Sequence, residues 1–247
     1  ALSVDGAFSN GITSSTFQNN KAGNEGLGGA VYLADTFSGG ITGSQFEGNQ
    51  ALSGGAIYLQ NGGIDNISGQ SLFEGNVATA LNGRSSGAGG AIALNDGDLT
   101  ITSALFANNK AVGEAGDPSS GRGGAIYINT FSADRTVNLT PDTNSAAVLE
   151  GNTMNPGLSG EVPNSIYFAN DADISVSAAR TSTLNINTAA NTQVIMLDPL
   201  ASQADNSSSN MYSMANLTVN VNKNGPGLWV LGGESNMAGS GAWNITR

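Results

Sequence analysis

The sequence predicts an all-β protein, a right-handed parallel β-helix with about one coil per 27–33 residue repeat. Three observations support this prediction. Gly supplies 35 of the 247 residues while charged residues make up only 11%, a composition that disfavours helices and favours turns joined by short strands. Two short motifs alternate along the chain. Their spacing is nearly constant on one side of the repeat and variable on the other, as expected of stacked coils with loops at one corner.

The first motif is Gly-Gly-Ala-(Ile/Val) followed by one or two further apolar residues. Its glycine pairs are Gly28 and Gly29, Gly54 and Gly55, Gly89 and Gly90, and Gly123 and Gly124. Each block predicts a strand of about four residues with a side-chain period of two, so Val31 and Leu33 share the core face with Ile57 and Leu59. The glycines are expected at a corner, where φ is positive or a Cβ would clash with backbone.

The second motif is Phe-x-x-Asn. It occurs as Phe17 to Asn20, Phe46 to Asn49, Phe73 to Asn76 and Phe106 to Asn109, with a degraded copy from Leu149 to Asn152. We expect the rings to stack inside the coil and the asparagines to form a hydrogen-bonded ladder along its axis. An Ile precedes Phe by five residues in three copies but by six in the copy at Ile67 and Phe73, which suggests a bulge. The right hand of the coil follows from the preference for right-handed crossovers between parallel strands.

The spacing of the motifs predicts where loops project. From the first Gly of a block to the next Phe the chain takes 18, 19 and 17 residues, whereas the return from Phe to Gly takes 11, 8, 16 and 17. Insertions are tolerated in surface loops and not in a core. The sequence therefore places variable loops at Lys21 to Leu27, Val77 to Ala88 and Lys110 to Arg122, and a very short connection after Asn49.

The composition excludes several classes of function. The absence of His and Cys removes imidazole bases, thiolates and the usual transition-metal ligands, and a net charge of −11 with scattered basic residues argues against nucleic acid. The closest carboxylate pairs are Asp96 with Asp98 and Asp171 with Asp173. They could act as acid and base or bind a hard cation, but both pairs also fit turns, which we favour. We expect no catalytic residue, metal or cofactor.

A column of tyrosines is the clearest candidate binding surface. Tyr32, Tyr58, Tyr127 and Tyr167 occupy equivalent positions on the face opposite the core aliphatics, with Ala93 between them. The column could contact a sugar or a protein, or it could be a stacking ladder that stabilises the coil. The loops add one arginine each, Arg84 and Arg122, and rigid scaffolds often carry function on such loops.

The two motifs together resemble the repeats of the polymorphic membrane proteins of chlamydiae and similar autotransporter passengers of other Gram-negative bacteria. The resemblance covers about residues 8–168. We expect a motif-bearing β-helix over 1–168, continued by less regular coils over 169–247, in one domain of a larger secreted protein. The resemblance implies a passenger domain at the cell surface or outer membrane, or secreted, and a C-terminal membrane barrel in the full-length protein.

The resemblance also implies a role in adhesion and virulence rather than catalysis. The expected partner is a host-cell surface or matrix protein or glycan, or another copy of the chain. Two alternatives stay open at this stage. One is a carbohydrate-active β-helix enzyme, and the other is a passive spacer that holds a distal binding domain away from the cell.

Overall fold

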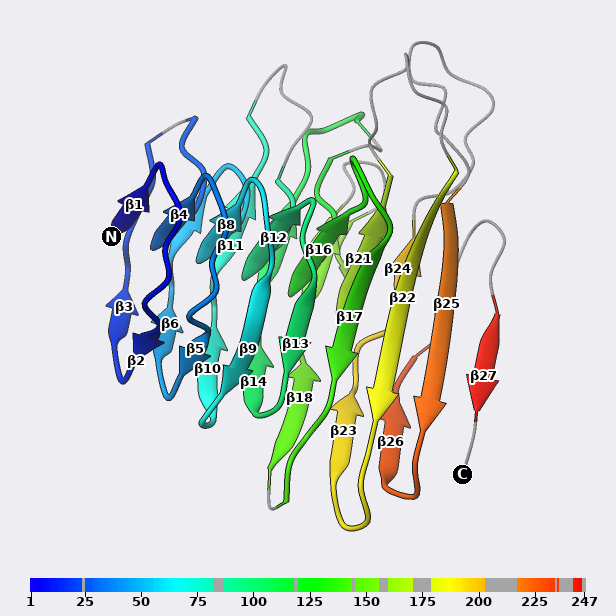
Figure 1. The fold of residues 1–247 in the computed structure, drawn as a ribbon. Helices are drawn as coiled ribbons and strands as arrows, with labels where there is room; N and C mark the ends of the chain where they lie inside the picture. The colour runs from blue at the N-terminus through cyan, green and yellow to red at the C-terminus, as the bar shows by residue number, and fades with distance from the viewer. Residues whose placement is uncertain are drawn as a thin grey trace.

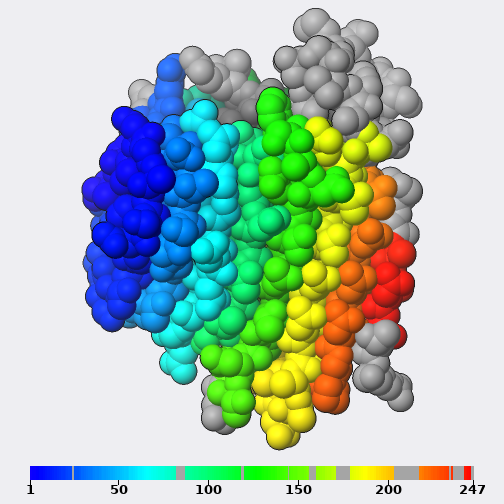
Figure 2. All heavy atoms as spheres, in the orientation of Figure 1, coloured from blue at the N-terminus to red at the C-terminus, as the bar shows by residue number. Residues whose placement is uncertain are grey.

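The computed structural model is a stack of β-coils in which four sheets run along one axis (Figure 1). The coils follow one another across the molecule in sequence order, from blue to red (Figure 2). It describes residues 1–23, 25–81, 87–117, 120–143, 145–155, 160–170, 179–202, 217–233, 235 and 242–245. Nearly every strand pair is parallel, and strands that neighbour in space are one coil apart in sequence. The prediction of a parallel β-helix is confirmed.

Each coil contributes strands to the sheets in a fixed order. The Gly-Gly-Ala sheet contains β1 (Leu2–Val4), β4 (Val31–Leu33), β8 (Ile57–Leu59), β12 (Ile92–Asn95), β16 (Ile126–Asn129), β21 (Ile166–Ala169) and β24 (Ala201–Ser202). The long sheet contains β2 (Ile12–Thr13), β5 (Ile41–Thr42), β9 (Ile64–Ser68), β13 (Leu99–Ile101), β17 (Arg135–Leu139), β22 (Arg180–Asn187), β25 (Leu217–Asn224) and β27 (Trp243–Ile245).

Two further sheets complete the coil. The phenylalanine sheet contains β3 (Thr16–Gln18), β6 (Gln45–Glu47), β10 (Ser71–Glu74), β14 (Ala104–Ala107), β18 (Ala146–Glu150), β23 (Gln193–Met196) and β26 (Leu228–Leu231). The short sheet contains β7 (Gln50–Ala51), β11 (Val77–Thr79), β15 (Lys110–Val112), β19 (Thr153–Asn155) and β20 (Val162–Pro163). Strand β20 pairs antiparallel with β19.

The coils are packed around one continuous apolar core. The aliphatic pairs of the Gly-Gly-Ala blocks face inward as expected, with Val31, Leu33, Ile57 and Leu59 all buried. The motif phenylalanines stack with ring centroids 4.6 to 5.0 Å apart, from Phe17 through Phe106. Farther along, Leu149, Met196 and Leu231 take over the same register, so the column of rings continues as aliphatic side chains.

The motif asparagines form the predicted ladder at a buried corner. The Nδ2 atoms of Asn49, Asn76 and Asn109 each donate to the Oδ1 of the next asparagine along the axis at 2.9 Å. They also donate to the carbonyl of the Phe one coil back, as Asn109 does to Phe73 at 2.9 Å. The ladder ends at Asp198, whose carboxylate accepts from the backbone and side chain of Asn152.

The glycine pairs have two separate causes. The first Gly of each block has positive φ, between 62° and 76°. The second Gly lies so close to the following coil that a Cβ on Gly90 would overlap the carbonyl oxygen of Gly124. Positive φ also occurs at the second x of every Phe-x-x-Asn copy, where the residue is always Gly or Asn, the types that best tolerate it.

Coil length changes along the axis. Successive ladder asparagines are 29, 27 and 33 residues apart in the first coils but 43 apart between Asn109 and Asn152. Asn138 and Asn185 in the long sheet are 47 apart. The repeat length expected from the motifs therefore describes the early coils, and the later ones are longer.

Two irregularities lie near the Ile67–Phe73 segment, and one of them accounts for its extra residue. A register shift lies within β9, between Ile64 and Ile67. The extra residue itself lies in the turn after β9, where Gly69 and Gln70 both have positive φ. The bulge is therefore upstream of Ile67, and the turn absorbs the added length.

Candidate functional site

The variable arc of the repeat lies at one corner of the coil, between the short sheet and the Gly-Gly-Ala sheet. In the second coil, Gly54 follows β7 after only two residues, Leu52 and Ser53. In the third and fourth coils the chain leaves this corner after β11 and β15 and returns at Ala88 and Arg122. These return points stack, since Gly54 N donates to Ala88 O at 2.8 Å and Gly89 N to Arg122 O at 2.9 Å.

The projecting loops are shorter than the sequence indicated. Val77 to Thr79 and Lys110 to Val112, expected as loop, are strands of the short sheet. Each of these strands has a single buried side chain, Ala78 and Ala111, which is why hydrophobic periodicity did not reveal them. The inserted segments are therefore 80–87 and 113–121. The residues at which the chain leaves and rejoins the coil stack on the equivalent residues of the neighbouring coil.

The tyrosine column runs along the outer face of the Gly-Gly-Ala sheet. Tyr32 and Tyr58 stack with centroids 6.0 Å apart, and Tyr127 and Tyr167 stack at 6.2 Å, on either side of Ala93. Tyr127 and Tyr167 are buried, 8% and 7% exposed, in a small apolar cluster beside the corner. Tyr32 and Tyr58 are half-buried, and they are the accessible half of the column.

The hydroxyl groups of Tyr32 and Tyr58 lie in different surroundings. The Tyr32 hydroxyl donates to Gln60 Oε1 at 2.6 Å. Burial raises the pKa of Tyr58, and the neighbouring Tyr32 raises it further. The Tyr58 side chain is therefore a neutral hydrogen-bonding group at physiological pH.

Arg122 anchors the corner and does not project from it. It is 7% exposed, and its guanidinium lies 5.3 Å from the centre of the Tyr167 ring. This cation–π contact ties the end of the fourth-coil loop to the tyrosine column. Arg84 lies outside the described residues, so of the six candidate binding residues Tyr32 and Tyr58 present accessible side chains.

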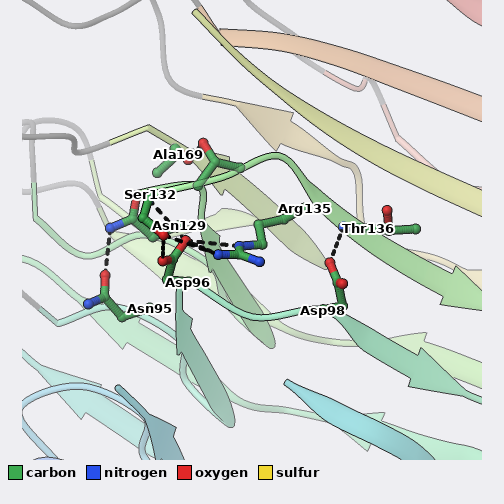
Figure 3. A network of polar contacts seen from close by, with 9 residues as sticks. Asn95, Asp96, Asp98, Asn129, Ser132, Arg135, Thr136 and Ala169 are labelled. Carbon is green, nitrogen blue, oxygen red and sulfur yellow. Dashed lines mark hydrogen bonds and ion pairs between the residues drawn. The ribbon is translucent and has the colours of Figure 1, made fainter. Parts of the chain in front are cut away.

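Asp96 and Asp98 bind the next coil (Figure 3). Asp96 accepts from Ser132 N at 3.0 Å, from Arg135 Nε at 2.9 Å and from the Ser132 hydroxyl. Asp98 accepts from Thr136 N at 2.7 Å. The two carboxylates thus cap different backbone groups, which fits a turn rather than an acid–base pair.

The charge on Asp96 is stabilised by these contacts. Burial by itself would raise the pKa of Asp96, but the hydrogen bonds from Ser132 and Arg135 and the charge of Arg135 together lower it. Asp134 repeats the arrangement one coil on, accepting from Thr181 N at 2.7 Å. The other pair singled out in the sequence, Asp171 and Asp173, lies outside the described residues.

The described part of the chain shows neither a metal-binding cluster nor a membrane-spanning helix. Within those residues, no group of three or more Asp and Glu side chains is placed to hold a metal ion. Nor does that part of the chain contain a helix of the length and apolarity needed to cross a membrane.

Comparison with known families gives one match. Residues 14–34, 43–60 and 103–129 match the Chlamydia polymorphic membrane protein repeat. Each matched stretch contains one Phe-x-x-Asn copy and the Gly-Gly-Ala block that follows it. No curated protein and no solved structure matches the chain. The predicted resemblance is confirmed at the level of the repeat, which is that of a non-enzymatic family of surface-exposed membrane proteins.

Proposed function

We propose that this chain, whose coils are polymorphic membrane protein repeats, is the passenger of an autotransporter and acts as an adhesin at the bacterial cell surface. Its ligand is a protein or glycan of the host cell or matrix. The β-helix is the rigid support, and the corner loops together with Tyr32 and Tyr58 are the contact surface. Tyr58 and the 80–87 loop belong to the same coil, with Tyr32 one coil before it and the 113–121 loop one coil after it.

The observation that carries this proposal is that the second, third and fourth coils differ in length mainly at one corner, on the return from the Phe-x-x-Asn motif to the next glycine pair. The insertions at 80–87 and 113–121 leave the register of the Gly-Gly-Ala, phenylalanine and short sheets continuous on either side. A scaffold that keeps its core constant and varies one edge can present new contacts without loss of stability.

The burial of the motif residues supports the same division. Phe46, Asn49, Phe73 and Asn76 have no exposed surface. A partner cannot touch them, so recognition falls to the positions between and outside the motifs.

The second coil supplies a template for testing the loops. Joining Thr79 directly to Ala88 deletes 80–87, and joining Val112 to Arg122 deletes 113–121; both connections then match the natural path from Ala51 through Leu52 and Ser53 to Gly54. We expect the doubly trimmed protein to keep its thermal midpoint and to lose binding to cultured host cells, measured by flow cytometry of labelled protein. Undiminished cell binding by a folded trimmed protein would favour the passive spacer.

The enzyme alternative has its own assay. The protein is incubated with acidic polysaccharides with and without Ca²⁺, and new reducing or unsaturated ends are measured against a heat-denatured control. We expect no difference between the two samples. Product formed only by the native protein would overturn the proposal that the chain acts by binding alone.

A further inference from the structure

The outer face of the phenylalanine sheet carries a row of aliphatic side chains that none of the described strands covers. Leu72, Leu105, Val148, Ile195 and Val230 occupy one register on successive strands from β10 to β26. All five are half-buried. At about 4.8 Å per coil the row is roughly 19 Å long, the reach of about six extended residues. Apolar rows of this kind on an outer face mark interaction sites.

A row of carboxylates runs beside the aliphatic row, two residues farther along each strand. It consists of Glu47, Glu74 and Glu150, the first x of three Phe-x-x-Asn copies, with Ala107 between the last two. Glu47 and Glu74 are directly opposite each other on neighbouring strands, an arrangement that destabilises a sheet. In the part of the chain that the structure describes, the ion pairs are Lys110 with Glu161 and Arg135 with Asp96, and neither involves this row.

The other side of the aliphatic row is hollowed. A groove of about 730 Å³ runs along it, lined by Leu72, Leu105 and Val148 and by the residues two positions earlier, Gln70, Ser103 and Ala146, with Gln193. Gln45, which also lines the groove, is in the same register as Leu72. The volume falls in the range of ligand sites. The face therefore offers a groove with amides at Gln45, Gln70 and Gln193, the aliphatic row, and the carboxylate row on the far side of it.

From this arrangement we propose that the outer face of the phenylalanine sheet binds a basic, partly apolar segment of another protein. The segment lies along the helix axis, with apolar side chains on the aliphatic row and Lys or Arg side chains on the carboxylates. Its main chain hydrogen-bonds to the groove amides. Charge complementarity relieves the repulsion between Glu47 and Glu74.

Other occupants fit less well. Nucleic acid and acidic glycans are repelled by the carboxylate row. A second copy of the chain offers no basic row, since its eight Lys and Arg are scattered singly in the sequence. Of these eight, Arg122 and Lys223 are buried, and Lys110 and Arg135 are in ion pairs. The partner is therefore a different protein.

This inference goes beyond the proposed function, because the phenylalanine sheet is a different surface from the loop corner. The probe is a fluorescein-labelled peptide of about twelve residues in which Lys alternates with Val and Ser, and the readout is fluorescence anisotropy at low salt. We expect saturable binding that weakens with added salt, and no binding of the same peptide with Glu in place of Lys.

Two triple variants test where on the protein the peptide probe binds. Glu47→Gln, Glu74→Gln and Glu150→Gln together should weaken binding about tenfold, from three exposed charge pairs. Asp5→Asn, Asp35→Asn and Asp65→Asn together change the net charge equally at exposed carboxylates outside the phenylalanine sheet, and should weaken binding less than twofold. Equal weakening by both variants, or no binding by the parent protein, would overturn the inference. Thermal midpoints check that each variant is folded.

A Leu105→Asn, Val148→Asn variant tests the aliphatic row separately and should also weaken probe binding about tenfold. The loop-trimmed protein should bind the probe as the parent does. Loss of probe binding on trimming would assign the peptide to the loop corner and overturn the assignment to this face. If cell binding did not depend on the loops, this result would contradict the proposed function and leave the inference about the phenylalanine sheet unchanged.

Discussion

The coils that carry the two motifs and the coils that follow them are held together in different ways. In the motif coils the long sheet is narrow, with two-residue strands β2 and β5, and the stack depends on buried rings and a buried amide ladder. In the later coils β22 and β25 are eight residues long, and the asparagine ladder is on the outside. Asn138, Asn185, Asn222 and Asn244 form that outer ladder.

This difference indicates what the two motifs contribute to the stability of the stack. A coil with short strands makes few backbone hydrogen bonds to its neighbours, and buried amides and rings supply the missing cohesion. A coil with long strands makes enough backbone bonds that Phe can become Met196 and Asn can become Asp198. The sequence repeat therefore decays while the same four sheets continue.

The largest effect is expected from a substitution at a place where the backbones of neighbouring motif coils lie in close contact. Gly90→Ala places a Cβ against the carbonyl oxygen of Gly124 and the backbone of Lys110, and we expect it to lower the free energy of unfolding by about 4 kcal/mol or more. Denaturant titration measures the change. The control is Gly6→Ala, where an added Cβ meets nothing within 4 Å and stability should stay within about 0.5 kcal/mol. A well-folded Gly90→Ala protein would contradict the packing described for the corner.

The next largest effect is expected in the column of rings, where substitutions at its two ends can be compared. Phe73→Ala removes a fully buried ring that stacks on both sides, and we expect a loss of about 4 kcal/mol. Leu231→Ala, in the same column but only partly buried, should lose about 1 kcal/mol. Equal losses measured by denaturant titration would mean that the motif coils do not depend on the ring stack.

The third effect compares the two asparagine ladders. Asn109→Ala leaves the Asn76 amide and the Phe73 carbonyl buried without partners, and we expect a loss of about 3 kcal/mol. Asn222→Ala removes bonds to Asn185 and Asn244 that water can replace, so its loss should be about 0.5 kcal/mol. A loss at Asn222 as large as that at Asn109 would remove the distinction between inner and outer ladders.

The smallest effect concerns the coil-to-coil clamp at Asp96. Its pKa is lowered in the folded protein, so the stability it contributes is present above pH 3.8 and is lost as the pH falls through the folded pKa. Arg135→Met should lower the free energy of unfolding by about 1 kcal/mol at pH 7. The difference from the parent protein should shrink below pH 3.8. A difference that is the same at pH 7 and pH 3 would mean that Arg135 acts through packing and not through the charge of Asp96.

Much of the fold was predictable from the motifs because their apolar residues and glycines face the core or the neighbouring coil. The inward aliphatics, the ring stack, the amide ladder and the corner glycines are all found where the sequence indicated. The left-handed position within Phe-x-x-Asn was missed, although the consistent Gly or Asn at the second x was a readable signal.

Other features left no pattern that a single sequence could show. The short sheet has two- and three-residue strands, and β7, β11 and β15 have one buried Ala each, too little for any periodicity. Asp198 replaces the ladder asparagine 46 residues after Asn152, in a coil whose motif has changed. The burial of Arg122, Tyr127 and Tyr167 depends on contacts between different coils at the corner, and the spacing of the motifs does not predict these contacts.

The central claim is that the motif coils are held by a buried amide ladder and the later coils are not. Native-state hydrogen exchange of the Asn76 amide, which donates to Asn109 Oδ1 at 3.1 Å, tests it most directly. We predict that this amide exchanges only through global unfolding in the parent protein and in Asn222→Ala, and much faster in Asn109→Ala. Unchanged protection of the Asn76 amide in a folded Asn109→Ala protein would contradict the claim.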